Sequence, residues 1–195
     1  MATIAAMVGG LGGGVFWPTA FGNPRTHPGT TQFEVFEGRV DITNPGRPLM
    51  DVNRLIDLPA QSRNVVLARA MRVLRFCEER GSGIDRVVAR AESEGLPAPL
   101  FEVLLAVAEG ADFMRVRLFG PRPYARMSED VRLRAVYLHA CLLDQRGERL
   151  TNASLRQRLG LQASQAAQVS RLIVLALKRG LIRPASDSAR ACLPG

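Results

Sequence analysis

Five polar residues near the carboxyl end have the side-chain types and the spacing to contact nucleic acid: Ser164, Gln165, Gln168, Arg171 and Lys178. Positions 164, 168, 171 and 178 recur at helical intervals, so they share one side of a helix. Serine and glutamine can hydrogen-bond to base edges in the major groove, while arginine and lysine contact base edges or phosphates. We expect this side to bind duplex DNA. For any single residue, a solvated helix surface is the alternative.

Three predicted helices and a short strand position these residues, in the order of a winged helix-turn-helix. Apolar residues four and three positions apart predict the first helix, which is expected to end near Arg146 and Gly147. Its core-facing residues are Val131, Ala135, Leu138 and Leu142. Winged helices also dock proteins, so contact with a protein partner is an alternative function of the same unit.

The second and third predicted helices follow at the spacing of a helix-turn-helix. Thr151 or Asn152 is expected to cap the second helix, which Gly160 ends in a left-handed conformation. Ser164 is expected to cap the third helix, which Gly180 ends before a short apolar strand. The residues expected to face the core in these two helices are Leu155, Leu159, Val169, Leu172, Ile173, Ala176 and Leu177.

Positive charge is concentrated in the same part of the chain. Residues 128–195 contain 11 Arg and Lys against 5 Asp and Glu, whereas residues 1–127 contain 15 against 13. Because phosphate neutralisation drives nucleic-acid affinity, a basic unit beside a nearly neutral one favours binding of a polyanion. Of the 26 basic residues 25 are arginine, so part of this excess is consistent with a compositional bias of the genome.

Composition sets further limits on the function. The chain has 195 residues and 47% apolar content, which is enough for one full domain and a smaller one. Its three cysteines show no CxxC or Cys-His spacing, so we expect buried free thiols in a reducing cytoplasm and no metal site. His27 and His139 are isolated in the sequence, and neither is expected to be a ligand or a base.

The first 30 residues differ from the rest of the chain. Residues 1–24 contain no charged side chain but six glycines and two prolines, a composition that disfavours a membrane helix. No basic residue precedes the apolar run, so a signal peptide is not expected either. We expect a disordered or atypical tail here and a second tail at residues 187–195.

The middle of the chain predicts an α+β layer. Alternating apolar residues on both sides of Glu37 and Gly38 predict a β-hairpin, which the turn at Asn44, Pro45 and Gly46 ends. Helices are expected over residues 65–79 and 84–94, and a second hairpin is expected around residues 109–110. The apolar stripe expected on the first of these helices is Val66, Ala70, Val73 and Cys77. Helices packed on an antiparallel sheet form such a layer. We place this domain at residues 31–122 and the winged helix at residues 128–186.

Residues 32–184 resemble a known family in two stretches. The first contains VDITNPGRPL, then QSRNVVLARAMRVLRFCEERGSGIDRVVARAESEGLPAPLFE and a strand pair. It resembles the C-terminal region of RecG-like transcriptional regulators, which usually carry a Schlafen AlbA-type domain upstream. The second stretch, which includes LTNASLRQRLGL, resembles the winged helix at the end of those regulators. The first stretch is similar in turn to the GHKL-type ATP-binding fold of histidine kinases, gyrases and certain heat-shock chaperones.

The resemblance implies a nucleotide site on three short motifs. The NPG turn, the SRN segment and the GSGI motif match the family, and two glycines before a helix allow anions to approach its amides. The residues that the resemblance assigns to ATP binding are Asn44, Gly46, Arg63, Asn64, Gly81 and Gly83. The alternative is that these glycines only end one helix and allow the next one to begin.

Two departures from the family argue against ATP hydrolysis. Residues 1–31 contain neither the Glu-x-x-x-Asn helix nor the HRDY sequence of the family, and Val65 replaces the proline that usually follows SRN. A magnesium ion would therefore lack a protein ligand from these motifs. We interpret this domain as a truncated or degenerate GHKL-like α/β sandwich, and we expect neither a cofactor nor ATPase activity.

Helicase activity is not expected, because the chain lacks a GxxxxGK[ST] loop. The leading hypothesis is a cytoplasmic DNA-binding transcriptional regulator, or the C-terminal part of one, that binds double-stranded DNA and forms a homodimer. The alternatives are a degenerate ATP-binding protein that would be named a DNA helicase by similarity, and a noncatalytic protein-interaction scaffold.

Overall fold

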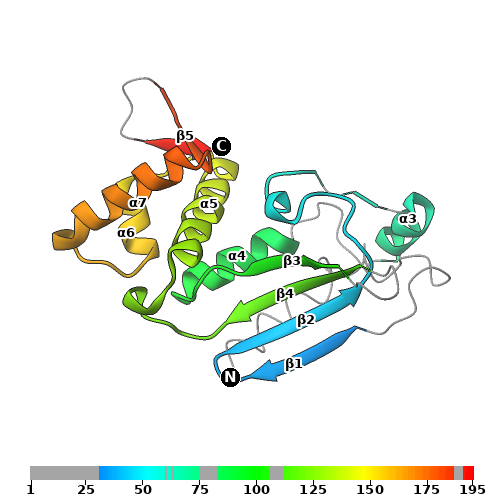
Figure 1. Ribbon diagram of the computed structural model, residues 1–195. Helices are drawn as coiled ribbons and strands as arrows, with labels where there is room; N and C mark the ends of the chain where they lie inside the picture. Colours follow the sequence, from blue (N-terminus) through cyan, green and yellow to red (C-terminus); the bar gives the residue numbers. More distant parts are fainter. Residues whose placement is uncertain (1–30, 60, 63, 75–82, 106–111, 187–190) are drawn as a thin grey trace. The chain divides into compact units, whose positions relative to one another are not determined.

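The computed structural model describes residues 31–59, 61–62, 64–74, 83–105, 112–186 and 191–195. The described chain divides into two compact units. Unit 1 holds the residues up to Arg90 together with Pro99–Gly120, and unit 2 holds Ala91–Ala98 together with Pro121–Gly195. Figure 1 gives the elements of both units. Among the described helices, none combines the length and the apolarity needed to cross a membrane.

Unit 1 is built on a four-stranded antiparallel sheet with the order β1-β2-β4-β3. Its strands are β1 (Gln32–Phe36), β2 (Arg39–Pro45), β3 (Leu100–Leu104) and β4 (Phe113–Phe119). The first hairpin is confirmed: Phe36 pairs with Arg39, and Gly38 has a φ of 77° that favours glycine at the turn. The pairing of β3 with β4 confirms the second hairpin, whose expected turn lies outside the described residues.

Alternation along the strands separates an apolar face of the sheet from a polar one. The apolar face includes Ile42 and Val116, which are register partners and fully buried. Next to Ile42 in the sheet, Phe33 of the edge strand β1 is 58% exposed, so burial on this face decreases toward the edge. The mixed α/β composition and the antiparallel sheet confirm the predicted α+β class and are consistent with a GHKL-like domain.

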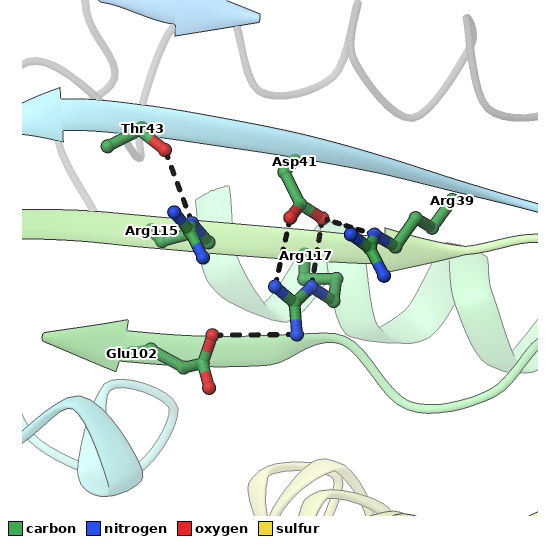
Figure 2. Close-up of polar contacts among 6 residues, drawn as sticks. All are labelled: Arg39, Asp41, Thr43, Glu102, Arg115 and Arg117. Carbon is green, nitrogen blue, oxygen red and sulfur yellow. Dashed lines mark hydrogen bonds and ion pairs between the residues drawn. The ribbon is translucent and has the colours of Figure 1, made fainter. Parts of the chain in front are cut away.

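The helices of unit 1 bury their surfaces to different extents. Helix α4 (Gly83–Ser93) begins in unit 1 and lies along the sheet in both views, and it buries Ile84, Val87 and Val88 (Figures 1 and 2). Helix α3 (Val65–Val73) begins where predicted, and a short 3-10 helix, η1 (Val52–Arg54), precedes it.

The apolar stripe predicted on one side of α3 is not buried in its described residues. Val66 is 80% exposed and Val73 is 77% exposed. Helical periodicity identifies a shared face but does not tell whether another element covers it. Cys77, the last member of the expected stripe, lies outside the described residues.

Unit 2 contains the helices α5 (Glu129–Gln145), α6 (Asn152–Arg158) and α7 (Ala166–Lys178) and the hairpin of β5 (Ile182–Pro184) with β6 (Cys192–Pro194). Two short 3-10 helices, η2 (Tyr124–Arg126) and η3 (Ala163–Gln165), precede α5 and α7. Leu150 pairs with Cys192 as an isolated antiparallel bridge beside the hairpin. Because β6 pairs with β5, the expectation of a tail over residues 187–195 is wrong at residues 192–194.

The ends of these helices follow the local chemistry of the chain. Ser128 caps α5, and Thr151 caps α6 through a capping box with Ser154, which decides between the two predicted caps. Gly147, Gly160 and Gly180 follow the ends of the three helices with φ values of 73°, 65° and 69°, which confirms the predicted helix ends and the left-handed conformation predicted for Gly160.

The core of unit 2 confirms most of the predicted inward positions. Helix α5 is buried over almost all its surface and not along one stripe, because residues 135–143 are all buried. In α6 and α7 the predicted core residues Leu155, Leu159, Val169, Leu172 and Ala176 are buried, while Ile173 and Leu177 are half-buried.

Candidate nucleic-acid interface

A continuous stripe of exposed residues runs along η3 and α7. It consists of Ser164, Ala167, Arg171, Val174 and Lys178, and we call it the α7 stripe. The spacing of three and four residues along it keeps every member on one side of the helix. Because Val169, Leu172 and Ala176 on the other side are buried, the α7 stripe is the solvent face of the helix.

The structure brings three of the five predicted DNA-contacting residues onto this stripe: Ser164, Arg171 and Lys178. Arg171 is held by a local hydrogen bond from its Nε to the carbonyl oxygen of Ala167 at 3.4 Å, which leaves the end of the guanidinium in solvent. Gln168 lies beside the stripe and is half-buried. The DNA contacts assigned to these residues stay predictions.

Gln165 and Ser164 have different local roles from those expected. The Gln165 Oε1 atom accepts a hydrogen bond from the backbone N–H of Gln162 at 2.9 Å, as part of a capping box over η3. The residue that precedes α7 is Gln165, without a side-chain cap. The prediction that Ser164 caps this helix is therefore wrong, because a 3-10 turn is inserted between the expected cap and the helix.

Sequence reasoning missed Val174 and Ala167, because it searched for polar side chains and these two are apolar. Spacing alone could have found them: positions 167 and 174 lie four residues before and three residues after Arg171. The exposed side of α7 is thus a cationic helix surface with an apolar residue between its two charges.

Asn152 connects α6 to the start of α7. Its Nδ2 atom donates to the carbonyl oxygen of Ala166 at 2.9 Å and to the Ser170 hydroxyl at 3.0 Å. Its Oδ1 atom accepts from the Arg156 Nε at 3.0 Å. The first two contacts join the start of α6 to the start of α7.

A buried ionic cluster of Glu92, His139 and Arg158 supports unit 2 from within. The Glu92 carboxylate lies 2.9 Å from the His139 Nδ1 and 3.1 Å from the Arg158 Nε. Arg158 is 7% exposed, and its Nη2 also donates to the carbonyl oxygen of Leu96 at 2.9 Å. Burial lowers the pKa of the Arg158 guanidinium, and the Glu92 charge opposes that shift.

The expectation that His139 is isolated holds for the sequence but not for the structure. Residues 92, 139 and 158 are far apart in the chain, and no local pattern relates them. They meet because the end of α4, the middle of α5 and the end of α6 pack within unit 2. From its charge alone, Arg158 would be predicted to face solvent.

The polar face of the unit 1 sheet holds a second set of charges (Figure 2). The Asp41 carboxylate is 2% exposed and accepts two hydrogen bonds from Arg117, each 2.9 Å long. Arg39 lies 3.4 Å from the same carboxylate, and Glu102 lies 3.8 Å from Arg117. The hydrogen bonds to Asp41 raise the pKa of Arg117 above its ordinary value.

The residues that the family resemblance assigns to ATP binding have structural roles where they are described. Asn44 is fully buried, and its Oδ1 accepts from the Thr31 hydroxyl. Asn64 Oδ1 accepts from the backbone N–H of Leu67 in the first turn of α3. Gly46 forms a turn with a φ of 104° and donates its N–H to the Asp112 carbonyl oxygen.

The fit of a nucleotide to these residues is poor in the described part of the chain. Gly83 is buried at the start of α4, and the predicted Arg63 and Gly81 lie outside the described residues. Within the described ranges, no group of three or more His, Cys, Asp or Glu side chains could hold a metal ion. A binding role for these residues stays a prediction that the burial of Asn44 disfavours.

Cys141 is a buried free thiol, as expected, and Cys192, in the segment expected to be a tail, is a buried free thiol as well. Burial raises the pKa of the Cys192 thiol, which disfavours the reactive thiolate. Their surroundings therefore favour a packing role over a chemical one.

Comparison with known proteins finds a family match on part of the sheet-containing unit. Residues 29–107 match the family model described as "Putative ATP-dependent DNA helicase recG C-terminal". A search of curated proteins found no match. Among solved structures, the DIP2311 protein from Corynebacterium diphtheriae is 20% identical, with a TM-score of 0.42. The similarity covers 86% of this chain but 36% of that one, so the chain spans little more than a third of its length. The family match confirms the resemblance for residues 29–107, which are similar to a RecG C-terminal-like, ATPase-type domain.

Proposed function

We propose that the chain is a cytoplasmic DNA-binding transcriptional regulator, or the C-terminal part of one, in which unit 2 is a winged helix and α7 enters the major groove. The order of α5, α6, α7 and the β5–β6 hairpin supports this proposal, and so does the bridge from Leu150 to Cys192. The hairpin takes the place of the wing. It carries Arg183, which is exposed and contributes a further positive charge.

The observation that carries the proposal is the exposed, cationic α7 stripe. Arg171 and Lys178 lie on it two turns apart, and α7 contains no acidic residue. Arg179, which follows the helix, has a different role because it pairs with Glu129 and Asp130. Cations without nearby carboxylates attract phosphates, and the helix presents them at the spacing of a recognition helix.

Fluorescence anisotropy with a labelled 30-base-pair duplex, titrated at several salt concentrations, tests the proposal. The Arg171→Ala, Lys178→Ala double variant should bind on the order of 10- to 100-fold more weakly at low salt. The slope of log affinity against log salt should fall by roughly 0.9 for each phosphate contact removed. The matched control is Arg47→Ala, Arg90→Ala, which removes two exposed charges from unit 1 and should bind like the wild type.

Equal affinity and salt slope for the wild type and the α7 double variant would overturn this assignment. If the control variant lost as much affinity as the α7 variant, binding would reflect net charge alone and not α7. Sedimentation of the complex would show whether two copies bind paired half-sites, as expected for a homodimer.

The family match of residues 29–107 favours one second candidate, a degenerate ATP-binding protein. A ligand that binds the folded state raises its melting temperature by mass action. Millimolar ATP with Mg²⁺ should therefore raise the melting temperature if a nucleotide site persists. No shift would exclude such a site, and we expect no shift because Asn44 is buried and Asn64 caps α3.

A further inference from the structure

Val174 lies at the centre of the α7 stripe. Its side chain is 50% exposed, whereas Val169 and Ala176 on the inward side of α7 are fully buried. It follows Arg171 by three residues and precedes Lys178 by four, so its isopropyl group projects between the two cationic side chains. Ala167, also exposed, continues the stripe one turn before Arg171.

A single exposed valine on a protein surface needs no explanation. The surroundings of Val174 are more specific, because a cation flanks it on each side along the stripe and α7 carries no acidic residue. An apolar protein partner docking on Val174 would have to cover Arg171 and Lys178 and desolvate them. The charges therefore favour a polyanion as the occupant of this surface.

The major groove of DNA presents both kinds of group that complement the α7 stripe, hydrogen-bond acceptors and apolar methyl groups. Phosphates and guanine edges accept hydrogen bonds from arginine and lysine, while the C5 methyl of thymine is the apolar group that the groove presents. We propose that Val174 contacts thymine methyl groups, so that the chain prefers duplexes with thymine opposite the middle of α7. This inference rests on the proposed function and deepens it by assigning a base preference to one residue.

Two duplexes that differ only in the C5 methyl group test the inference. The alternating copolymer of dA and dT is compared with the copolymer of dA and dU in the same salt series. The wild type should bind the thymine duplex about fourfold more tightly for each methyl contacted, from the transfer of one methyl out of water. Val174→Ser should bind the two duplexes equally and should match the wild type on the dU duplex within about twofold, because its charges are unchanged. Val66→Ser is the matched control, since Val66 of unit 1 is 80% exposed and far from α7 in the chain.

A second duplex pair removes the effect of base composition. Copolymers of dG with dC or with 5-methyl-dC place the same methyl group at the same position in the groove, so the wild type should prefer the methylated one and Val174→Ser should not. Equal binding of the wild type within both pairs overturns the inference and leaves the proposed function intact. A methyl preference that Val174→Ser retains also overturns it, because the preference then comes from another residue or from duplex shape. If the wild type binds none of the duplexes at low salt, the proposed function fails and the inference fails with it.

Discussion

In the sheet of unit 1, Asp41 is 2% exposed and accepts both hydrogen bonds of the Arg117 fork, and Arg39 lies near the same carboxylate. In α7 of unit 2, Arg171 and Lys178 are exposed, and among the described residues no carboxylate lies within ion-pair distance of either. Both regions carry basic side chains, which are paired with a carboxylate in the first region and exposed in the second. On the sheet, Asp41 and Arg117 neutralise each other within the fold, whereas the charges on α7 are presented to solvent.

This difference shows how far a count of charges can be used to find a binding surface. Residues 128–195 have the larger positive excess, but Arg158 is buried in an ionic cluster and Arg179 pairs with Glu129 and Asp130. The charge of Arg158 is compensated inside unit 2, and the charge of Arg179 is compensated by exposed carboxylates. What distinguishes a surface for a polyanion is a set of basic residues that remain exposed and unpaired on one face.

The largest effect on stability should come from the buried cluster of unit 2. Glu92→Ala leaves Arg158 buried without its carboxylate, and breaking such a pair costs about 3–5 kcal/mol. Urea denaturation followed by circular dichroism measures the loss. The control is Glu148→Ala, an exposed glutamate whose removal should change stability by less than about 0.5 kcal/mol. A loss as small for Glu92→Ala as for the control would show that the cluster does not hold unit 2 together.

A smaller effect is expected on the polar face of the sheet. Asp41→Ala removes the acceptor of the Arg117 hydrogen bonds and should cost about 1–3 kcal/mol, because Arg117 still has Glu102 at 3.8 Å and is partly solvated. The same denaturation measurement applies. Glu34→Ala is the control, since Glu34 is the register partner of Asp41 on the edge strand but is exposed. Equal losses of stability for the two variants would mean that the Arg117–Asp41 pair stabilises the fold no more than an exposed glutamate does.

The smallest effect should come from α7. Replacing both Arg171 and Lys178 by alanine should change the free energy of unfolding by less than about 1 kcal/mol, because both side chains are exposed and Lys178, in the last turn of α7, adds only the small stabilisation that a cation gives a helix C-terminus. This result would separate residues that hold the fold from residues that are free to bind. A loss of several kcal/mol would place these two side chains among the structural charges and remove the contrast between the two regions.

The fold could be predicted from the sequence wherever the signals are local. Glycines at 147, 160 and 180 end helices because they adopt positive φ, and alternation around Gly38 defines the first hairpin and its register. The sequence could not reveal the exposure of Val66 and Val73. Their periodicity is the same whether or not another element covers that face of α3.

The candidate site could be predicted only in part, for two physical reasons. Polarity is an imperfect guide to exposure, so half-buried Gln168 was selected and exposed Val174 was not. Long-range contacts have no signal in a single sequence, so the meeting of Glu92, His139 and Arg158 emerged only from the packing of three helices. Arg171 and Lys178 were identified correctly as members of one exposed face, because their separation of seven residues is two helical turns.

The most direct test of the central claim is to map where duplex DNA contacts the ¹⁵N-labelled chain by NMR. On titration with a 16-base-pair duplex, amide signals of residues 164–178 should shift or broaden first, and the arginine Nε signal of Arg171 should change with them. Signals of β2 and β4, where Asp41 pairs with Arg117, should stay in place. Perturbations centred on the Asp41–Arg117 face of the sheet, with α7 unaffected, would contradict the assignment of the exposed α7 stripe as the DNA-binding surface.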